Sequence, residues 1–255
     1  MKLIDTHTHL NVKEFSGDIA EVIYRAENEG VQKFYLPAID SSEIGAMISL
    51  EKQFPGKCMA MAGLHPCSVK ENFREELAIV EKLLSERKFA AIGETGLDFY
   101  WDKTFIKEQY ESLHIQAVWA LQYKVPLVLH TREAMQETID IISSYKGKGL
   151  AGIFHCFSGT LKNAKDIIDL GFLLGIGGVV TYKNSGLAEI VKEIGLESIV
   201  LETDAPYLTP VPFRGKRNES SYLKYVAQKI ADVKNISVDE VAERTTENAE
   251  RIFGF

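Results

Sequence analysis

The sequence is poor in cysteine, and its three thiols have no spacing that suggests a zinc knuckle or a disulfide framework. Cys58, Cys67 and Cys156 are an odd number without a CxxC pair, which is typical of reduced thiols in a cytosolic protein. Proline is also scarce, with 7 residues in the chain. Collagen-like, disordered and low-complexity classes are therefore excluded, and we expect an ordinary globular protein without disulfides.

Long apolar runs are lacking as well. No segment approaches the roughly 18 consecutive apolar residues of a membrane span. Asp5, His7 and His9 stand where a signal peptide needs apolar residues. We therefore expect a cytoplasmic location without membrane contact, and the sequence gives no sign of an obligate protein partner.

Positive charge is in deficit. The chain has 29 Lys and Arg residues against 36 Asp and Glu residues, which gives a formal net charge of −7. A protein that holds nucleic acid through a broad basic surface has the opposite balance. A polyanionic substrate would therefore need positive charge concentrated at its binding site.

What the sequence does contain is a regular alternation of short apolar runs with longer amphipathic segments. This pattern predicts parallel strands joined by helices. The predicted strands are 2–6, 31–37, 58–63, 89–93, 126–130, 152–155, 172–176 and 198–202. The predicted helices are 18–29, 42–53, 75–87, 106–123, 134–145, 161–170, 186–194, 221–231 and 238–253. Eight strand–helix units in 255 residues predict an α/β protein with a (β/α)8 TIM barrel as one domain over residues 1–255, and a doubly wound open sheet is the alternative.

Polar residues stand at the carboxyl ends of the apolar runs, where a barrel carries its catalytic groups. Five of the six histidines do so, together with one glutamate and one aspartate. These residues are His7, His9, His65, Glu94, His130, His155 and Asp204. A barrel brings the ends of distant strands into one ring, so these side chains are expected to converge.

His7 and His9 are two residues apart, so they point to the same face of an extended strand and can bind one divalent ion. Alone, such a pair is more often two ordinary polar residues at a strand end. The motifs IGET, LVLH, IFHC and LETD, which end four other apolar runs, favour the metal interpretation.

Several motifs resemble one known family. The segments LIDTHTHLN, GLHP, GETGLDFYW, PLVLHTREA, HCFSG, LETDAPYLTP and RGKRNE closely resemble the TatD-family metal-dependent deoxyribonucleases, in order and spacing, through nearly the whole chain. The resemblance implies a barrel of the amidohydrolase superfamily with a dinuclear metal centre.

The resemblance also implies roles for the ligands. His7, His9 and Asp204 would bind one ion, His130 and His155 the other, and Glu94 would bridge both. Oxygen and nitrogen ligands fit Mg²⁺, Mn²⁺ or Zn²⁺, and the sequence does not choose among these ions. Glu94 and Asp204 are the catalytic candidates, and Asp204 is the residue expected to accept or orient the proton of the attacking water.

Five residues are candidates for substrate binding: His65, Arg132, Arg214, Arg217 and Asn218. His65 would contact a phosphate or hydrogen-bond within its loop, and Arg132 would bind a phosphate or form a salt bridge. The other three follow the eighth strand in the loop 205–220, which favours a phosphate path over a solvated charge run.

Two further interpretations concern single residues. Asp98 is interpreted as the N-cap of a helix rather than as support for a metal ligand. Three residues depart from the family pattern: Gln136, Leu196 and Ser220. Ser220 stands where the family usually has proline, and it is the one that bears on the shape of the loop 205–220.

The leading functional hypothesis is hydrolysis of DNA phosphodiester bonds, or those of RNA, from the 3′ end with two divalent ions. The alternative is an amidohydrolase that cleaves an amide, ester or lactone, including an aminoacyl-tRNA ester. The charged loop around Arg214 favours the nucleic acid. A metal-binding protein without catalysis is the weakest hypothesis, because every expected ligand is present.

Overall fold

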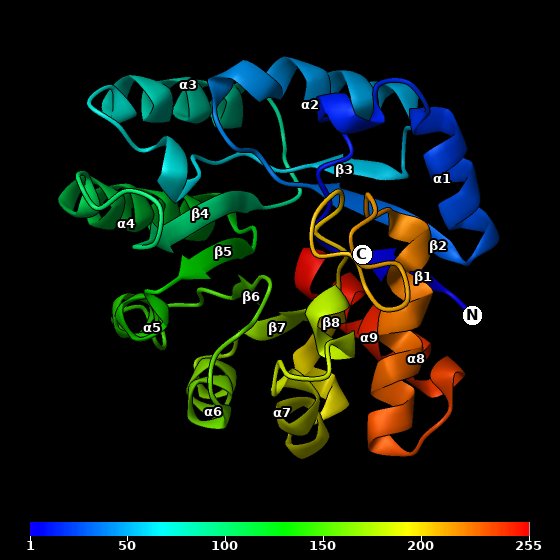
Figure 1. Ribbon diagram of the computed structural model, residues 1–255. Helices are drawn as coiled ribbons and strands as arrows, with labels where there is room; N and C mark the ends of the chain where they lie inside the picture. The colour runs from blue at the N-terminus through cyan, green and yellow to red at the C-terminus, as the bar shows by residue number, and fades with distance from the viewer. Residues whose placement is uncertain (255) are drawn as a thin grey trace.

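Each predicted strand is present in the computed structural model, which describes residues 1–254. The strands are β1 Leu3–Asp5, β2 Val31–Leu36, β3 Cys58–Ala60, β4 Ile92–Asp98, β5 Leu127–Arg132, β6 Gly152–Phe154, β7 Leu173–Ile176 and β8 Ile199–Leu201. They run around one axis, with helices on the outside (Figure 1).

The helices also lie close to their predicted positions. They are α1 Ile19–Asn28, α2 Ser41–Gln53, α3 Phe73–Glu86, α4 Ile106–Tyr123, α5 Met135–Ser143, α6 Leu161–Asp169, α7 Leu187–Glu193, α8 Leu223–Lys234 and α9 Val238–Phe253. Within residues 1–254, no helix combines the length and the apolar character needed to cross a membrane.

Two seams close the strands into a barrel. The strands pair in chain order within β1–β2–β3 and within β4 to β8. Between β3 and β4, Ala62 forms a parallel bridge with Ile92. Between β8 and β1, Thr6 N–H donates to the carbonyl of Leu201 (3.0 Å), and the Asp5 carboxylate accepts from Thr203 N–H (2.9 Å). The (β/α)8 prediction is confirmed.

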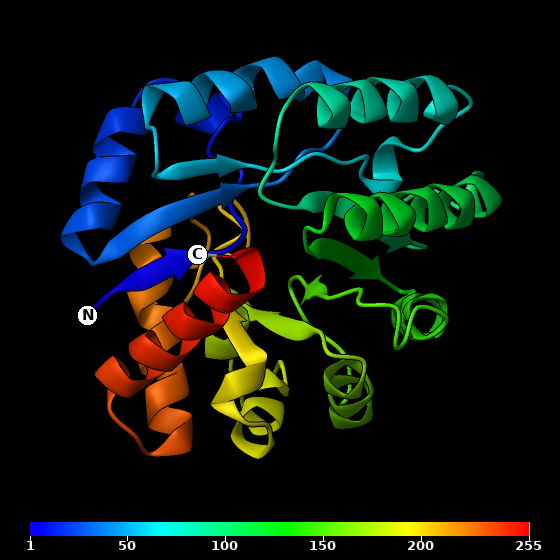
Figure 2. The ribbon, with the colours of Figure 1, turned by 180° about the vertical axis from the view of Figure 1, so that it is seen from behind.

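The amino end of the barrel is plugged by α9. An apolar cluster fills this end with inward side chains such as Ile4, Met61 and Val200, and Ala249 of α9 belongs to it. The ring of Phe253 stacks on that of Tyr35 at 3.7 Å between centroids. Figure 2 shows α9 (red) lying across this end, which leaves the carboxyl end of the barrel for a site.

The fourth strand differs from its prediction. It continues from Gly93 to Asp98, so Glu94 lies inside β4 rather than after it, and the predicted end of this strand is wrong. Gly96 explains the difference: a Cβ at this position would lie 2.0 Å from the carbonyl oxygen of His130, so only glycine lets β4 run this close to β5. Residues 95–98 pair with β5 as far as Arg132, after an irregularity between Ile92 and Thr95.

Candidate metal centre

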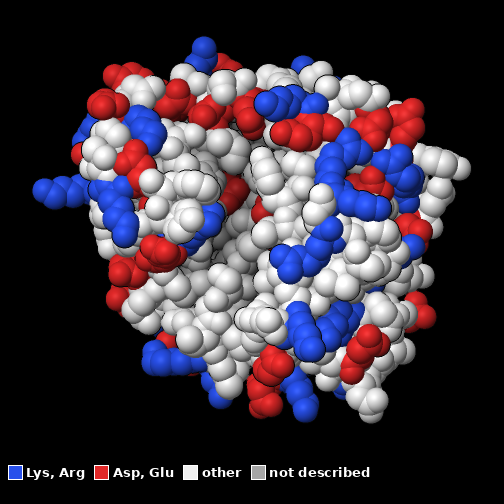
Figure 3. Space-filling model, in the orientation of Figure 1, with Lys and Arg blue, Asp and Glu red and all other residues white. Residues whose placement is uncertain are grey.

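A cavity of about 730 Å³ opens at the carboxyl end of the barrel. Figure 3 shows it as a hollow in this face with acidic atoms at its floor. The predicted ligands His9, Glu94, His130, His155 and Asp204 line it, and His65 and Arg132 also belong to its wall. The barrel thus brings together residues that lie almost 200 positions apart.

Glu94 lies at the centre of this group, with its two carboxylate oxygens facing different histidines. Oε2 is 3.1 Å from Nε2 of His7 and 3.9 Å from Nε2 of His9. Oε1 is 2.9 Å from Nδ1 of His130 and 3.4 Å from Nε2 of His155. One buried carboxylate therefore connects two sets of nitrogen atoms.

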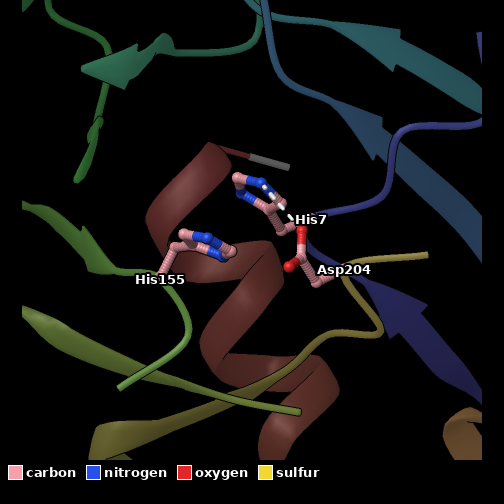
Figure 4. Close-up of side chains that lie close together, drawn as sticks. All are labelled: His7, His155 and Asp204. Atoms are coloured by element: carbon pink, nitrogen blue, oxygen red, sulfur yellow. Dashed lines mark ion pairs between the residues drawn. The ribbon is translucent and has the colours of Figure 1, made fainter. Parts of the chain in front are cut away.

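Asp204 completes the side of the cluster that His7 and His9 form. Its Oδ1 lies 3.3 Å from Nε2 of His9 and 3.7 Å from Nε2 of His7. Figure 4 shows Asp204, His7 and His155 pointing toward one another, and the rings of the two histidines stack at 3.6 Å. Three groups have ligand atoms close enough to hold an ion: His7, His155 and Asp204; His7, His9 and Glu94; His65, Glu94 and His130.

The buried imidazole of His7 tests whether these residues suit a metal ion. His7 is 1% exposed, and neither of its ring nitrogens makes a hydrogen bond to any residue of 1–254. Leaving such a polar group unsatisfied is unfavourable. Carboxylate oxygens lie beside its Nε2, so a cation between them would satisfy both kinds of group, and the donor set fits a divalent metal.

The ionisation of the cluster points the same way. Burial raises the pKa of Glu94, but His155, His7 and His65 outweigh this and hold the pKa well below its usual range. Burial lowers the pKa of His155, but Glu202 and Glu94 outweigh this and raise the pKa to about 10. Without an ion the neighbouring carboxylates therefore favour a proton on His155, and a divalent cation bound at this ring would displace that proton.

Asp98 is not a helix N-cap, and that prediction is wrong. It is the last residue of β4, and α4 begins only at Ile106. Oδ2 of Asp98 lies 2.9 Å from Nε2 of His130. If His130 donates its Nε2–H there, its Nδ1 keeps a lone pair toward Glu94 and is free to bind a metal. The sequence did not predict this pairing, because the predicted strand ended at Gly93 and did not place Asp98 beside β5.

Glu202 is a residue that the sequence interpretation missed. It is wholly buried, and its Oε1 lies 3.1 Å from Nδ1 of His155 and accepts from Cys156 N–H. It therefore fixes the tautomer of His155 that leaves Nε2 for a metal. The sequence signal that could have identified it is an acidic residue directly at the end of the last apolar run, two positions before Asp204.

His65 has a different hydrogen-bonding state. Its Nδ1 accepts a hydrogen bond from Cys67 N–H at 3.1 Å, so the neutral ring carries its proton on Nε2. That nitrogen lies 3.4 Å from Oε1 of Glu94. A protonated nitrogen donates rather than binds a metal, which is consistent with the predicted contact to substrate.

The three predicted substrate residues of the loop 205–220 lie in different environments. Arg214 is exposed and lies over the ring of Tyr182 (4.2 Å). Arg217 is held by two hydrogen bonds to the carboxylate of Asp18 (2.6 and 2.8 Å). This pairing occupies the charge of Arg217 at the surface, where its side chain is 33% exposed, and the phosphate contact stays a prediction.

Asn218 is fully buried, so its side chain is not exposed on the phosphate path that was predicted for it. Its amide donates to the carbonyls of Thr203 and Tyr207, and its Oδ1 accepts from Glu219 N–H. Ser220 is also buried, with its hydroxyl 3.5 Å from that of Thr8. These two residues hold the loop against the ends of β1 and β8.

Comparison with known proteins gives a consistent result. A family model described as TatD related DNase matches residues 4–254. The chain is 39% identical to the uncharacterized metal-dependent hydrolase YabD of Bacillus subtilis (strain 168), over 98% of each chain. It is 31% identical to the 3′-5′ ssDNA/RNA exonuclease TatD of Erwinia tasmaniensis, over 98% of this chain and 99% of the relative. The crystal structure of YJJV, a TatD homologue from Escherichia coli K12, superposes with a TM-score of 0.93 at 28% identity, covering 99% of this chain and 98% of the other.

Proposed function

The chain belongs to the TatD-related DNase family of metal-dependent hydrolases, and from this premise we propose that it removes nucleotides from the 3′ end of DNA or RNA with two divalent ions. The position of Glu94 carries the proposal. One carboxylate lies between two sets of imidazoles, as a bridge between two ions requires. The named activity of the Erwinia tasmaniensis relative supports the choice of substrate and direction.

We assign His7, His9 and Asp204 to one ion, His130 and His155 to the other, and Glu94 to both. Two divalent ions held by these residues would supply a more acidic bound water and positive charge to offset that of the phosphate. Their positive charge would also allow a protein with a net charge of −7 to bind a nucleic acid end, because the cations are concentrated at the point where the strand is cleaved.

The protein's own side chains then divide the remaining tasks. Asp204 has a carboxylate at the cavity wall and accepts or orients the proton of the attacking water. His65 donates its Nε2–H to a phosphate oxygen, and Arg132 supplies a fixed positive charge. Asp98 and Glu202 hold His130 and His155 in the tautomers that binding of an ion needs.

Hydrolysis of an amide, ester or lactone, including an aminoacyl-tRNA ester, is the second candidate. One observation favours it: Arg217 is paired with Asp18, so the loop offers less free positive charge than a nucleic acid strand would use. The same ring of ligands suits attack on a carbonyl carbon.

A substrate panel tests the proposal. The protein, loaded in turn with Mg²⁺, Mn²⁺ or Zn²⁺, is incubated with 5′-labelled single-stranded DNA, with RNA, and with ester and lactone substrates. We expect labelled strands to shorten stepwise from the 3′ end, and a chelator to stop the reaction. Hydrolysis of esters alone would overturn the nucleic-acid proposal in favour of the second candidate, and no hydrolysis with any ion would overturn both.

A further inference from the structure

Two large aromatic side chains are exposed immediately after β4. Trp101 is 67% exposed and Tyr100 is 48% exposed. Their rings meet edge to face with centroids 4.9 Å apart, so they form one aromatic surface. Single exposed apolar residues are ordinary on proteins, but adjoining exposed aromatics at a cavity mouth are typical of a binding site.

Arg132 extends this surface toward the metal centre. Its guanidinium carbon lies 3.9 Å from the ring centroid of Tyr100 and 5.0 Å from that of Trp101. Arg132 is the last residue of β5 and follows His130 by two positions. The guanidinium therefore lies against the aromatic rings, on the strand that also carries a proposed ligand, and offers both a flat face and a positive charge.

The aromatic residues are fixed in position by a carboxylate of the site itself. Oδ1 of Asp98 accepts hydrogen bonds from the backbone N–H groups of Tyr100 (2.9 Å) and Trp101 (3.0 Å). The other oxygen of Asp98 pairs with His130. The distance between the aromatic surface and the metal centre is therefore set by one side chain, and a ligand that touches both finds them already in place.

The cavity has a particular distribution of charge. Trp101 and Arg132 line it together with the ligand cluster. Among its lining residues in the described part of the chain, Arg132 is the only Lys or Arg. With divalent ions bound by the ligand cluster, as proposed above, a ligand that fits has an anionic group there and a flat aromatic group beside Trp101 and Arg132. A nucleobase joined to a phosphodiester has this chemistry.

We propose that Trp101, Tyr100 and Arg132 form a stacking subsite for a nucleobase next to the phosphodiester that is cleaved. This inference rests on the proposed function. Stacking needs only the face of a base, so the subsite accepts every base. A base inside a duplex already has both faces stacked, so the subsite favours strand ends whose last bases are unpaired.

Kinetics on two matched substrates test the subsite. One is a single-stranded oligonucleotide with normal bases, and the other has abasic nucleotides at its 3′ end. Stacking on an aromatic side chain changes affinity by roughly 5- to 150-fold per base. We expect Trp101→Ala to lower kcat/KM on the normal strand about 10-fold, mainly through KM, and to have little effect on the abasic strand. Trp101→Phe keeps a stacking ring and should stay close to wild type.

Tyr24→Ala is the matched control, because Tyr24 is an equally exposed aromatic residue (65%) on α1 and does not line the cavity. It should leave both substrates unaffected. Equal losses on both substrates in Trp101→Ala, or no loss on either, would overturn the subsite even if the protein hydrolyses nucleic acid.

A binding measurement separates the subsite from the hydrolytic activity. The chain has two tryptophans, and Trp119 is only 6% exposed, so stacking of a base acts on Trp101. A phosphorothioate oligodeoxyadenylate should quench the fluorescence, and its abasic counterpart should not. If this probe quenches the fluorescence but the protein hydrolyses no unmodified strand, the proposed function is rejected and the subsite remains as a nucleotide-binding surface. Equal signals from the normal and the abasic strand would reject the subsite.

Discussion

Glu94 is the residue on which the account depends most, because its two oxygens connect the two sets of histidines. We expect Glu94→Ala to lower hydrolysis at least about 10³-fold, since two correctly held ions supply several kcal/mol of charge stabilisation. The fold should persist, because the apolar core lies elsewhere in the barrel. Steady-state kinetics at saturating metal, together with circular dichroism, check both statements.

His114→Ala provides the control for this experiment. His114 is the one histidine outside the cluster, on α4, where its Nδ1 lies 2.9 Å from the hydroxyl of Tyr145. It should keep full activity. Near-normal turnover by a folded Glu94→Ala protein would refute the bridging role.

Glu202 acts on the ions only through His155, so its substitution has a different expected result. Glu202→Gln keeps the shape of the side chain but removes the charge that holds His155 in one tautomer. We expect metal affinity to fall about 10- to 100-fold, measured by titration calorimetry. Glu51→Gln, which alters a glutamate paired with Arg87, should leave the affinity unchanged, and an unchanged affinity in Glu202→Gln would show that His155 needs no such support.

At the scale of single elements, the loop 205–220 shows why charge read from a sequence is an incomplete guide. Arg214 and Arg217 are three residues apart. Arg217 forms an ion pair with Asp18, whereas Arg214 lies over the ring of Tyr182. We expect Arg214→Ala to reduce the slope of log affinity for DNA against log salt by roughly one unit, and Arg217→Ala to leave it unchanged while lowering the thermal midpoint.

Affinities measured at several salt concentrations in an Asp204→Asn background, which prevents cleavage, check this prediction. Equal slopes for Arg214→Ala and the unsubstituted protein would remove Arg214 from the substrate path.

The strands illustrate what the sequence could predict and what it could not. Apolar runs located all eight, because a strand buried on both faces has a continuous pattern that needs no partner to be recognised. The end of β4 was not predicted, because polar residues such as Glu94 and Asp98 within a strand look like the start of a loop. Gly96 allows this part of β4 to pass close to β5. The pairings of Asp98 with His130 and of Glu202 with His155 could not be predicted for a different reason: they join segments far apart in the sequence, and spacing along the chain does not encode them.

The whole molecule separates stability from chemistry along the barrel axis. The ligand cluster occupies the carboxyl end, and α9 closes the amino end through contacts such as Phe253 on Tyr35. We expect Phe253→Ala to lower the free energy of unfolding by about 2 kcal/mol, through lost apolar contact and ring stacking, and to leave kcat unchanged. Urea unfolding and kinetics on the same preparation check this. Lost activity at unchanged stability would mean that the amino end influences the site.

The central claim is that six side chains from five strands and the residues that follow them form one metal centre with two ions, bridged by Glu94. An anomalous-scattering map from crystals grown with Mn²⁺ tests it most directly. The account predicts two peaks about 3.5–4 Å apart, each within about 2.0–2.5 Å of an oxygen of Glu94, one near His7, His9 and Asp204 and the other near His130 and His155. A single peak, or two peaks that do not share Glu94, would contradict it.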